Sequence, residues 1–236
     1  MAMSGRIVVE ISVESVERAV AAERGGASRI ELCGALEIGG VTPSVELMRE
    51  ARARVRVPIF SMVRPRGGDF VYSAAEFAEM RKAIEVARGE GMDGVVFGLL
   101  WPSGGVDVER TMELVRAAAF LPVTFHRAFD QTADLFAASE DVIATGATRL
   151  LTSGGAGTAP EAVGRIAELM RKAKGRIVVM PGSGITAGNI AEVARVTGAA
   201  EFHAGLSSVV GRDARVEEFE QEVRRLVEAV GKSGRG

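Results

Sequence analysis

The chain has 236 residues, of which 47% are hydrophobic and 25% are charged, and its formal net charge is −2. These values are typical of a globular protein, and the charge balance argues against a nucleic-acid or membrane partner. The single cysteine, Cys33, excludes an intramolecular disulfide and any site built from several thiolates of one chain.

Short β-branched runs alternate with longer segments of helical periodicity along the whole chain. The expected strands are 7–11, 28–32, 57–63, 94–98, 122–125, 148–151, 176–180 and 200–203. The expected helices lie near 14–23, 43–54, 74–90, 107–119, 132–145, 160–174, 187–196 and 215–230. The first strand is too short for a membrane span or a signal peptide, and no apolar run reaches about 18 residues, so we expect a cytoplasmic protein.

Eight strand–helix units predict a single-domain (β/α)8 TIM barrel over residues 1–230, followed by a disordered tail at 231–236. An open doubly wound sheet is the alternative, and the near-regular spacing of the eight units makes it the weaker one. A repeat supports the count, because four of the strands are entered through a glycine-led turn. These turns read Gly26-Ala-Ser-Arg-Ile30, Gly91-Met-Asp-Gly-Val95, Gly146-Ala-Thr-Arg-Leu150 and Gly198-Ala-Ala-Glu-Phe202.

Polar residues gather where the expected strands end, which is where TIM barrels carry their active sites. His126 is the best acid–base candidate, because its ordinary pKa lies near neutral pH. The full set of catalytic candidates is His126, Glu31, Glu10, Arg64 and Asp130. The alternative is a network of salt bridges that fills the barrel mouth without chemistry.

Other residues in these loops are candidates for ligand binding. Arginine forks suit carboxylates and phosphates, and glycine-rich loops after the seventh and eighth strands often hold an anion in barrels. The candidates are Arg66, Asp69, Arg127, Thr152, Ser153, Gly154, Gly182, Gly184, His203 and Gly205. The sequence leaves two alternatives open, namely that the glycines serve only tight turns and that His203 is a core residue.

Several stretches resemble the CutC family of copper homeostasis proteins. They are Arg29-Ile-Glu-Leu-Cys-Gly-Ala-Leu36, Gly39-Gly-Val-Thr-Pro-Ser44, Val63-Arg-Pro-Arg-Gly-Gly-Asp-Phe70, Val123-Thr-Phe-His-Arg-Ala-Phe-Asp130 and Arg149-Leu-Leu-Thr-Ser-Gly154. The resemblance implies a TIM barrel, a cytoplasmic location and a role in copper handling.

Copper chemistry limits this expectation. Cu(I) favours thiolate and thioether ligands, and Cys33 is the only thiol, so a site would combine it with a histidine and Met62. We therefore expect at most weak direct Cu(I) binding. The alternative function is an enzyme that acts on a small anionic or phosphorylated metabolite. A homodimer is the expected assembly.

Overall fold

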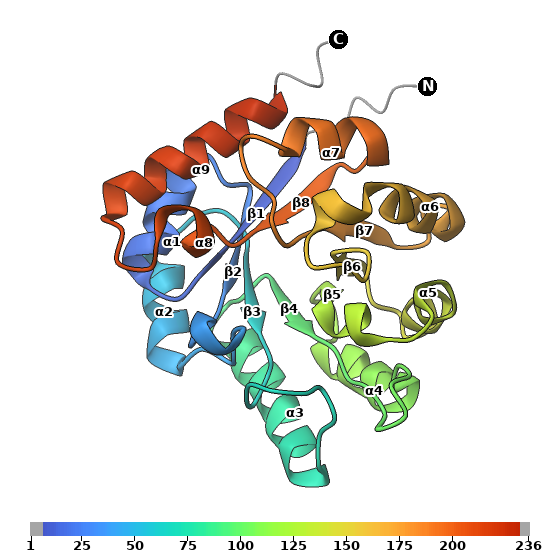
Figure 1. Ribbon diagram of the computed structural model, residues 1–236. Helices are drawn as coiled ribbons and strands as arrows, with labels where there is room; N and C mark the ends of the chain where they lie inside the picture. The colour runs from blue at the N-terminus through green and yellow to red at the C-terminus, as the bar shows by residue number, and fades with distance from the viewer. Residues whose placement is uncertain (1–6, 232–236) are drawn as a thin grey trace.

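The computed structural model describes residues 7–231, except the side chains of residues 207 and 208. Eight parallel strands run in the order β7-β6-β5-β4-β3-β2-β1-β8. The two end strands of this order, β7 and β8, lie side by side and nearly close the sheet into a barrel (Figure 1). The strands are β1 Val8–Val13, β2 Arg29–Leu32, β3 Ile59–Met62, β4 Gly94–Phe97, β5 Val123–Phe125, β6 Arg149–Thr152, β7 Val178–Pro181 and β8 Glu201–Ala204. The predicted TIM barrel is confirmed.

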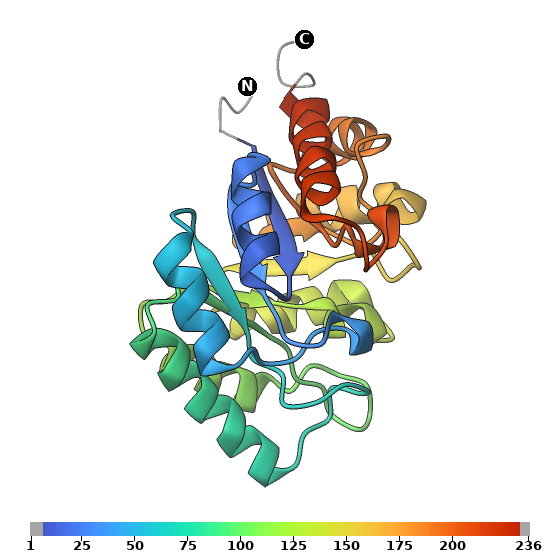
Figure 2. The same ribbon diagram turned by 90° about the vertical axis from the view of Figure 1, so that its left-hand side faces the viewer.

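Helices surround the barrel, and all eight expected helices are present with ends within a few residues of the prediction (Figure 1). They are α1 Val16–Arg24, α2 Val45–Arg54, α3 Ala74–Gly89, α4 Val108–Ala118, α5 Leu135–Ala144, α6 Val163–Ala173, α7 Ile190–Thr197 and α9 Val216–Gly231. The last helix packs beside α1, which joins the two ends of the fold (Figure 2). Gly231 ends α9 rather than opening the predicted tail, and residues 232–236 lie outside the described part.

Short helical turns within the βα loops were not predicted. They are η1 Leu36–Ile38, η2 Arg127–Gln131, η3 Ala159–Ala162 and α8 Ser207–Val210. Each has five residues or fewer, which is too short to give a hydrophobic periodicity in the sequence. All four follow the carboxyl end of a strand, so they shape the face of the barrel where the functional site is expected.

The expected periodicity of α3 is observed in its packing. Met80, Ile84 and Ala87 are buried against the sheet at spacings of three and four residues. Ser73 and Glu76 form a capping box, in which the serine side chain accepts the Glu76 N–H and the glutamate accepts the Ser73 N–H.

The barrel interior is filled by charged and aromatic side chains from the amino-terminal halves of the strands. The Arg29 guanidinium donates to Glu10 and, at 2.8 Å, to Glu201, while Arg149 donates to the same Glu201 carboxylate at 2.7 Å. Both guanidinium carbons lie over the Phe60 ring, 4.9 and 5.2 Å from its centroid. The alternation of side chains along each strand thus brings both signs of charge into one buried layer.

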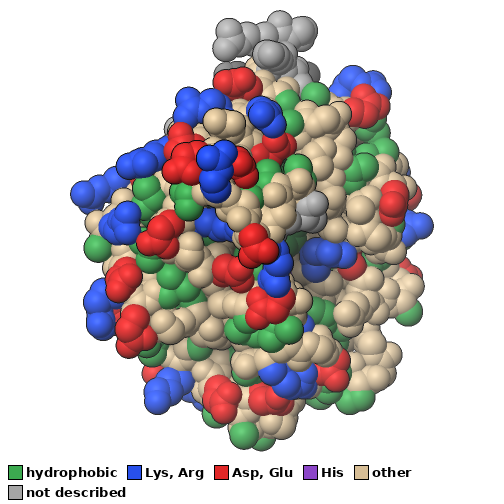
Figure 3. Space-filling model, turned by 60° about the vertical axis from the view of Figure 1, so that its left-hand side comes forward, with side chains coloured by type: hydrophobic (Ala, Val, Ile, Leu, Met, Phe, Trp, Pro, Cys, Tyr) green, Lys and Arg blue, Asp and Glu red, His purple; other side chains and the backbone are tan. Residues whose placement is uncertain are grey.

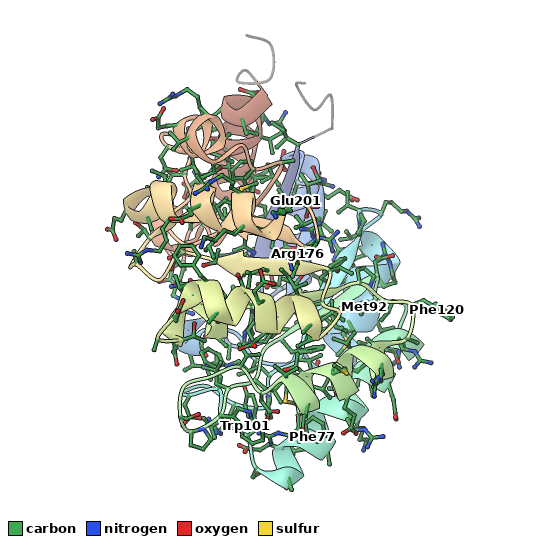
Figure 4. All side chains as sticks on the ribbon, turned by 90° about the vertical axis from the view of Figure 1, so that its right-hand side faces the viewer. Phe77, Met92, Trp101, Phe120, Arg176 and Glu201 are labelled. Atoms are coloured by element: carbon green, nitrogen blue, oxygen red, sulfur yellow. The ribbon has the colours of Figure 1, made fainter. Side chains whose placement is uncertain are left out.

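The outer surface is polar and mixed in charge. Lysine and arginine are interspersed with aspartate and glutamate over the face shown in Figure 3. Six large apolar side chains are exposed among the described residues, and two of them are aromatic. These two, Trp101 after β4 and the fully exposed Phe120 before β5, lie on different sides of the barrel (Figure 4). Within residues 7–231, no helix is both long and apolar enough to cross a membrane.

Candidate functional site

A cavity of about 570 Å³ opens at the carboxyl ends of the strands. Its walls combine acidic, basic and apolar side chains with glycines from the βα loops. The lining residues are Ser12, Glu31, Leu36, Glu37, Gly39, Met62, Arg64, Phe70, His126, Arg127, Leu151, Ser183, Gly184, His203, Gly205 and Arg212. A volume of this size is typical of small-molecule sites.

An acidic and imidazole cluster forms one wall of the cavity. Strand register places Glu10 on β1 directly opposite His203 on β8, and His203 Nδ1 lies 2.7 Å from Glu10 Oε1. Its other ring nitrogen, Nε2, faces Glu31 Oε2 on β2 at 3.9 Å. The three side chains therefore form a continuous line from the buried Glu10 to the cavity surface.

The charges around this line determine where its protons reside. Burial opposes ionisation of Glu10, but Arg29 and His203 outweigh it and hold the pKa of Glu10 at about 2. Burial, with the charge of Glu10, raises the pKa of Glu31. Burial lowers the pKa of His203, but Glu31 and Glu10 outweigh it and the net shift is upward. Arg29 and Arg149 place positive charge against Glu10 and Glu201 in the layer below.

His126 lies on the opposite wall and is held as a neutral ring. It caps η2, since its Nδ1 accepts the Ala128 N–H at 3.3 Å, and its ring packs on Phe70 with centroids 4.8 Å apart. Burial, with the charge of Arg64, lowers the pKa of His126 to about 3. The neutral ring therefore carries its proton on Nε2, which is buried and has no partner among the described residues.

Arg64 organises the loops beside His126. Its terminal nitrogens donate to the carbonyls of Ile38, Gly39, Gly40 and Gly68 at 2.7–3.2 Å. The guanidinium also lies 4.7 Å from the Phe70 centroid. The arginine thus joins the loops after β2 and β3 and leaves its positive charge at the cavity wall.

The neighbouring arginine of the same loop has another role. Arg66 pairs with Asp69 at 2.9 Å and with Glu76 at 2.5 Å, which ties the loop to the start of α3. Neither Arg66 nor Asp69 lines the cavity.

Asp130 anchors the loop after β6. Its carboxylate accepts the backbone N–H groups of Ser153 and Gly155 at 2.9 and 3.0 Å and the hydroxyl of Thr152. Arg127, which lines the cavity, donates to the same carboxylate at 3.0 Å and to the Ser153 hydroxyl at 3.3 Å. Asp130 therefore positions Arg127 and the loop rather than facing the cavity itself.

Of the four predicted glycines, two line the cavity and two do not. Gly184 and Gly205 line the cavity, whereas Gly154 and Gly182 pack closely against neighbours. A Cβ on Gly182 would lie 2.4 Å from Leu151, and one on Gly154 would lie 2.8 Å from Ala162. The conformation of Gly154, with φ +73°, also favours glycine.

The single thiol lies behind Glu31. Cys33 is fully buried, and its Sγ donates to Glu31 Oε2 at 3.5 Å. Burial and the Glu31 charge raise the pKa of this thiol well above its ordinary value, so it stays protonated at neutral pH. The residues present do not fit a tight Cu(I) site, because the one thiol is protonated and Met62 is the single thioether among the described residues of the cavity lining.

A harder donor set lies next to the thiol. Ligand atoms of Glu10, Glu31 and His203 all lie within 4.8 Å of one another, close enough to hold a metal ion. Arg29 already pairs with Glu10, so a cation there would compete with its guanidinium.

Two interior arginines were absent from the predicted site. Arg29 and Arg149 are each the fourth residue of a glycine-led turn, and Glu201 and Gly94 occupy the same place in the other two repeats. This shared position could have predicted that Arg29 and Arg149 point into the barrel, because equivalent residues of alternate strands form one interior layer. Ser12, Phe70 and Leu151 also line the cavity and were not predicted, since hydroxyl and apolar residues give no distinct pattern.

The fold and the cavity define a TIM-barrel protein with a ligand-sized pocket and a buried acid–imidazole cluster at its carboxyl-end face. Residues 7–208 match the CutC family model, and the chain belongs to this family. A protein of Chromobacterium violaceum named as a CutC family protein is 44% identical over 96% of this chain and 99% of its own. The human copper homeostasis protein cutC homolog is 48% identical over 85% of this chain and 74% of its own.

Solved structures agree with this assignment. The CutC structure from Streptococcus agalactiae superposes with a TM-score of 0.79 at 32% identity, covering 84% of this chain and 98% of its own. A thiamine phosphate pyrophosphorylase from Pyrococcus furiosus reaches a TM-score of 0.61 at 19% identity and covers 95% of this chain and 96% of its own, a likeness of fold alone.

Proposed function

We propose that this protein contributes to cytoplasmic copper homeostasis while binding Cu(I) at most weakly. Relatives at 44–49% identity carry the CutC or copper homeostasis name, which supports the copper role. The observation that carries the weak affinity is the state of Cys33, the only thiol, which is buried, protonated and hydrogen-bonded to Glu31. A homodimer stays a prediction, which sedimentation velocity tests.

Competition with the Cu(I) chelator bicinchoninate under reducing conditions tests this proposal. We expect the copper to stay with the chelator for the wild type and for Cys33→Ser alike. Met62→Leu, beside the thiol, and Met80→Leu, in the α3 core, are a matched pair that should behave identically. Transfer of one Cu(I) per chain to the wild type, abolished by Cys33→Ser, contradicts weak binding.

A second candidate function is catalysis on a small anionic metabolite in the cavity. The specific observation is that Glu31 and His203 face each other at 3.9 Å on the same lining that carries the guanidinium charge of Arg64 and Arg127. A carboxylate whose pKa is raised by burial suits a general base near neutral pH. Arginine supplies the charge that an anionic substrate needs.

Thermal-shift measurements with phosphate, carboxylates and sugar phosphates test the second function. We expect stabilisation by at least one of these anions, reduced in Arg127→Gln and unchanged in Arg195→Gln on the distant, exposed face of α7. The absence of stabilisation by every anion would contradict this function.

A further inference from the structure

Three residues that line the cavity carry a buried polar atom with no hydrogen-bond partner among the described residues. One is Nε of Arg64, whose terminal nitrogens are held by backbone carbonyls. The other two, from opposite walls, are Oε1 of Glu31 and Nε2 of His126, whose residues are 3% and 4% exposed. Both side chains line the same cavity, one from β2 and one after β5. Buried polar groups are nearly always paired in folded proteins, so these two atoms indicate a missing partner in the space between the walls.

The atoms of Glu31 and His126 need hydrogen-bond partners of opposite kinds. His126 Nδ1 already accepts the Ala128 N–H, so Nε2 carries the ring proton and is a donor. The Glu31 carboxylate is an acceptor, with Oε2 facing Cys33 and His203 while Oε1 faces no donor. The partner must therefore both accept and donate, which a hydroxyl group does and a methylene or a bare carboxylate does not.

We propose that the cavity binds a small hydroxylated anion, a sugar acid or a sugar phosphate, whose oxygens accept from His126 Nε2–H and whose hydroxyls donate to Glu31 Oε1. This inference rests on the second function proposed above and names its ligand class. The anionic group lies toward Arg64 and Arg127, which carry positive charge on the same lining. Hydroxyl groups reproduce the hydrogen bonds of the water that they displace, so the cavity selects them over apolar groups.

Matched pairs of probes that differ in hydroxyl groups test the proposal. Gluconate and hexanoate share carbon number and charge, as do ribose 5-phosphate and pentyl phosphate. Titration calorimetry with the wild type should give at least tenfold tighter binding for the hydroxylated member of one pair. The pair in which the preference occurs distinguishes a carboxylate from a phosphate ligand.

Three variants assign the preference to the cavity. His126→Phe removes the donor and should reduce the preference about tenfold, the factor set by about 1.4 kcal/mol. His126→Gln keeps an N–H donor and should retain most of the preference for the hydroxylated probe. Thr124→Val is the matched control, since Thr124 also has a buried hydroxyl without a partner, two residues earlier on β5, but does not line the cavity.

The outcomes separate this inference from the function on which it rests. Equal binding of both members of each pair, or a preference that survives His126→Phe, overturns the hydroxylated ligand while leaving an anion site. Failure of every anion to bind overturns both. Hydroxyl preference that is lost in His126→Phe and kept in Thr124→Val supports the inference whether or not His126→Phe is less stable.

Discussion

At the scale of single residues, the barrel interior is a case of buried charge balanced by buried charge. Arg29 contacts both Glu10 and Glu201, and Arg149 shares Glu201, so no carboxylate of this layer lacks a guanidinium partner. Removing one partner of such a network leaves another charge buried and unpaired, which costs more than the intact network contributes.

Replacing Arg29 with methionine tests this balance. We expect Arg29→Met to lower the free energy of unfolding by about 3–5 kcal/mol, because Glu10 and Glu201 lose their shared partner. Urea denaturation measures the change. Arg195→Met, which breaks an exposed pair with Glu192 on α7, is the control and should leave the stability unchanged within error. A similar loss in both variants would contradict a special role for the buried layer.

His126 gives a pH dependence with a definite sign. Its pKa is lowered to about 3 in the folded protein, while the unfolded chain binds the proton near pH 6.5. Between these values the unfolded state holds more protons, so stability falls as the pH falls, by at most about 1.4 kcal/mol per pH unit from this group.

The comparison of the wild type with His126→Gln isolates this slope. We expect urea midpoints of the wild type to decrease more steeply than those of the variant between pH 6.5 and about 3. Parallel curves would contradict the lowered pKa, because they would mean that His126 takes up its proton equally in the folded and unfolded states. Below about pH 4.5, protonation of Glu10 lowers the stability of both proteins, because the pKa of Glu10 in the folded state is about 2. This contribution cancels when the stability of the variant is subtracted from that of the wild type.

At the scale of elements, the loops after β5 and β6 depend on one carboxylate. The strand β5 has only three residues, and the turn η2 that follows brings Asp130 beneath the loop 153–155. Backbone N–H groups that would otherwise be unpaired are satisfied there. The position of Arg127 at the cavity depends on the same anchor.

We expect Asp130→Ala to destabilise the protein by about 3 kcal/mol, since several hydrogen bonds to one charged acceptor are lost. Hydrogen exchange at Ser153 and Gly155 should accelerate. Asp134→Ala provides the control, because it removes only the N-cap of α5 at a cost of about 1 kcal/mol and leaves those two amides protected. Unchanged exchange in Asp130→Ala would contradict the anchoring role.

At the scale of the whole molecule, the fold was readable from sequence and the site only in part. Apolar periodicity and the glycine-led turns report local geometry, so the eight units and their order followed. The residues of the cavity come from strand ends and loops that are far apart in the chain. His203 pairs with Glu10 across the closure of the barrel, and Arg127 reaches the cavity through its contact with Asp130. Such pairings depend on register and closure, which periodicity does not report.

The glycine-led turns show the same limit. Glycine at position 94 could be read as turn chemistry alone, yet in the folded barrel it makes room for the Phe60 ring, over which both interior arginines lie. A Cβ on Gly94 would lie 2.6 Å from this ring. The fourth position of each repeat therefore determines how the interior is filled across the whole barrel.

Gly94→Ala tests whether the interior is packed without spare room. We expect a loss of about 1–3 kcal/mol in the free energy of unfolding, because the added methyl must displace Phe60 and, with it, both arginines. Gly89→Ala is the matched control: no atom lies within 4 Å of its Cβ, and it ends α3, so alanine should be neutral or stabilising by up to about 1 kcal/mol. Equal stability of the two variants in urea would mean that the Phe60 ring can move without cost. The buried charges that pack on this ring would then be free to rearrange.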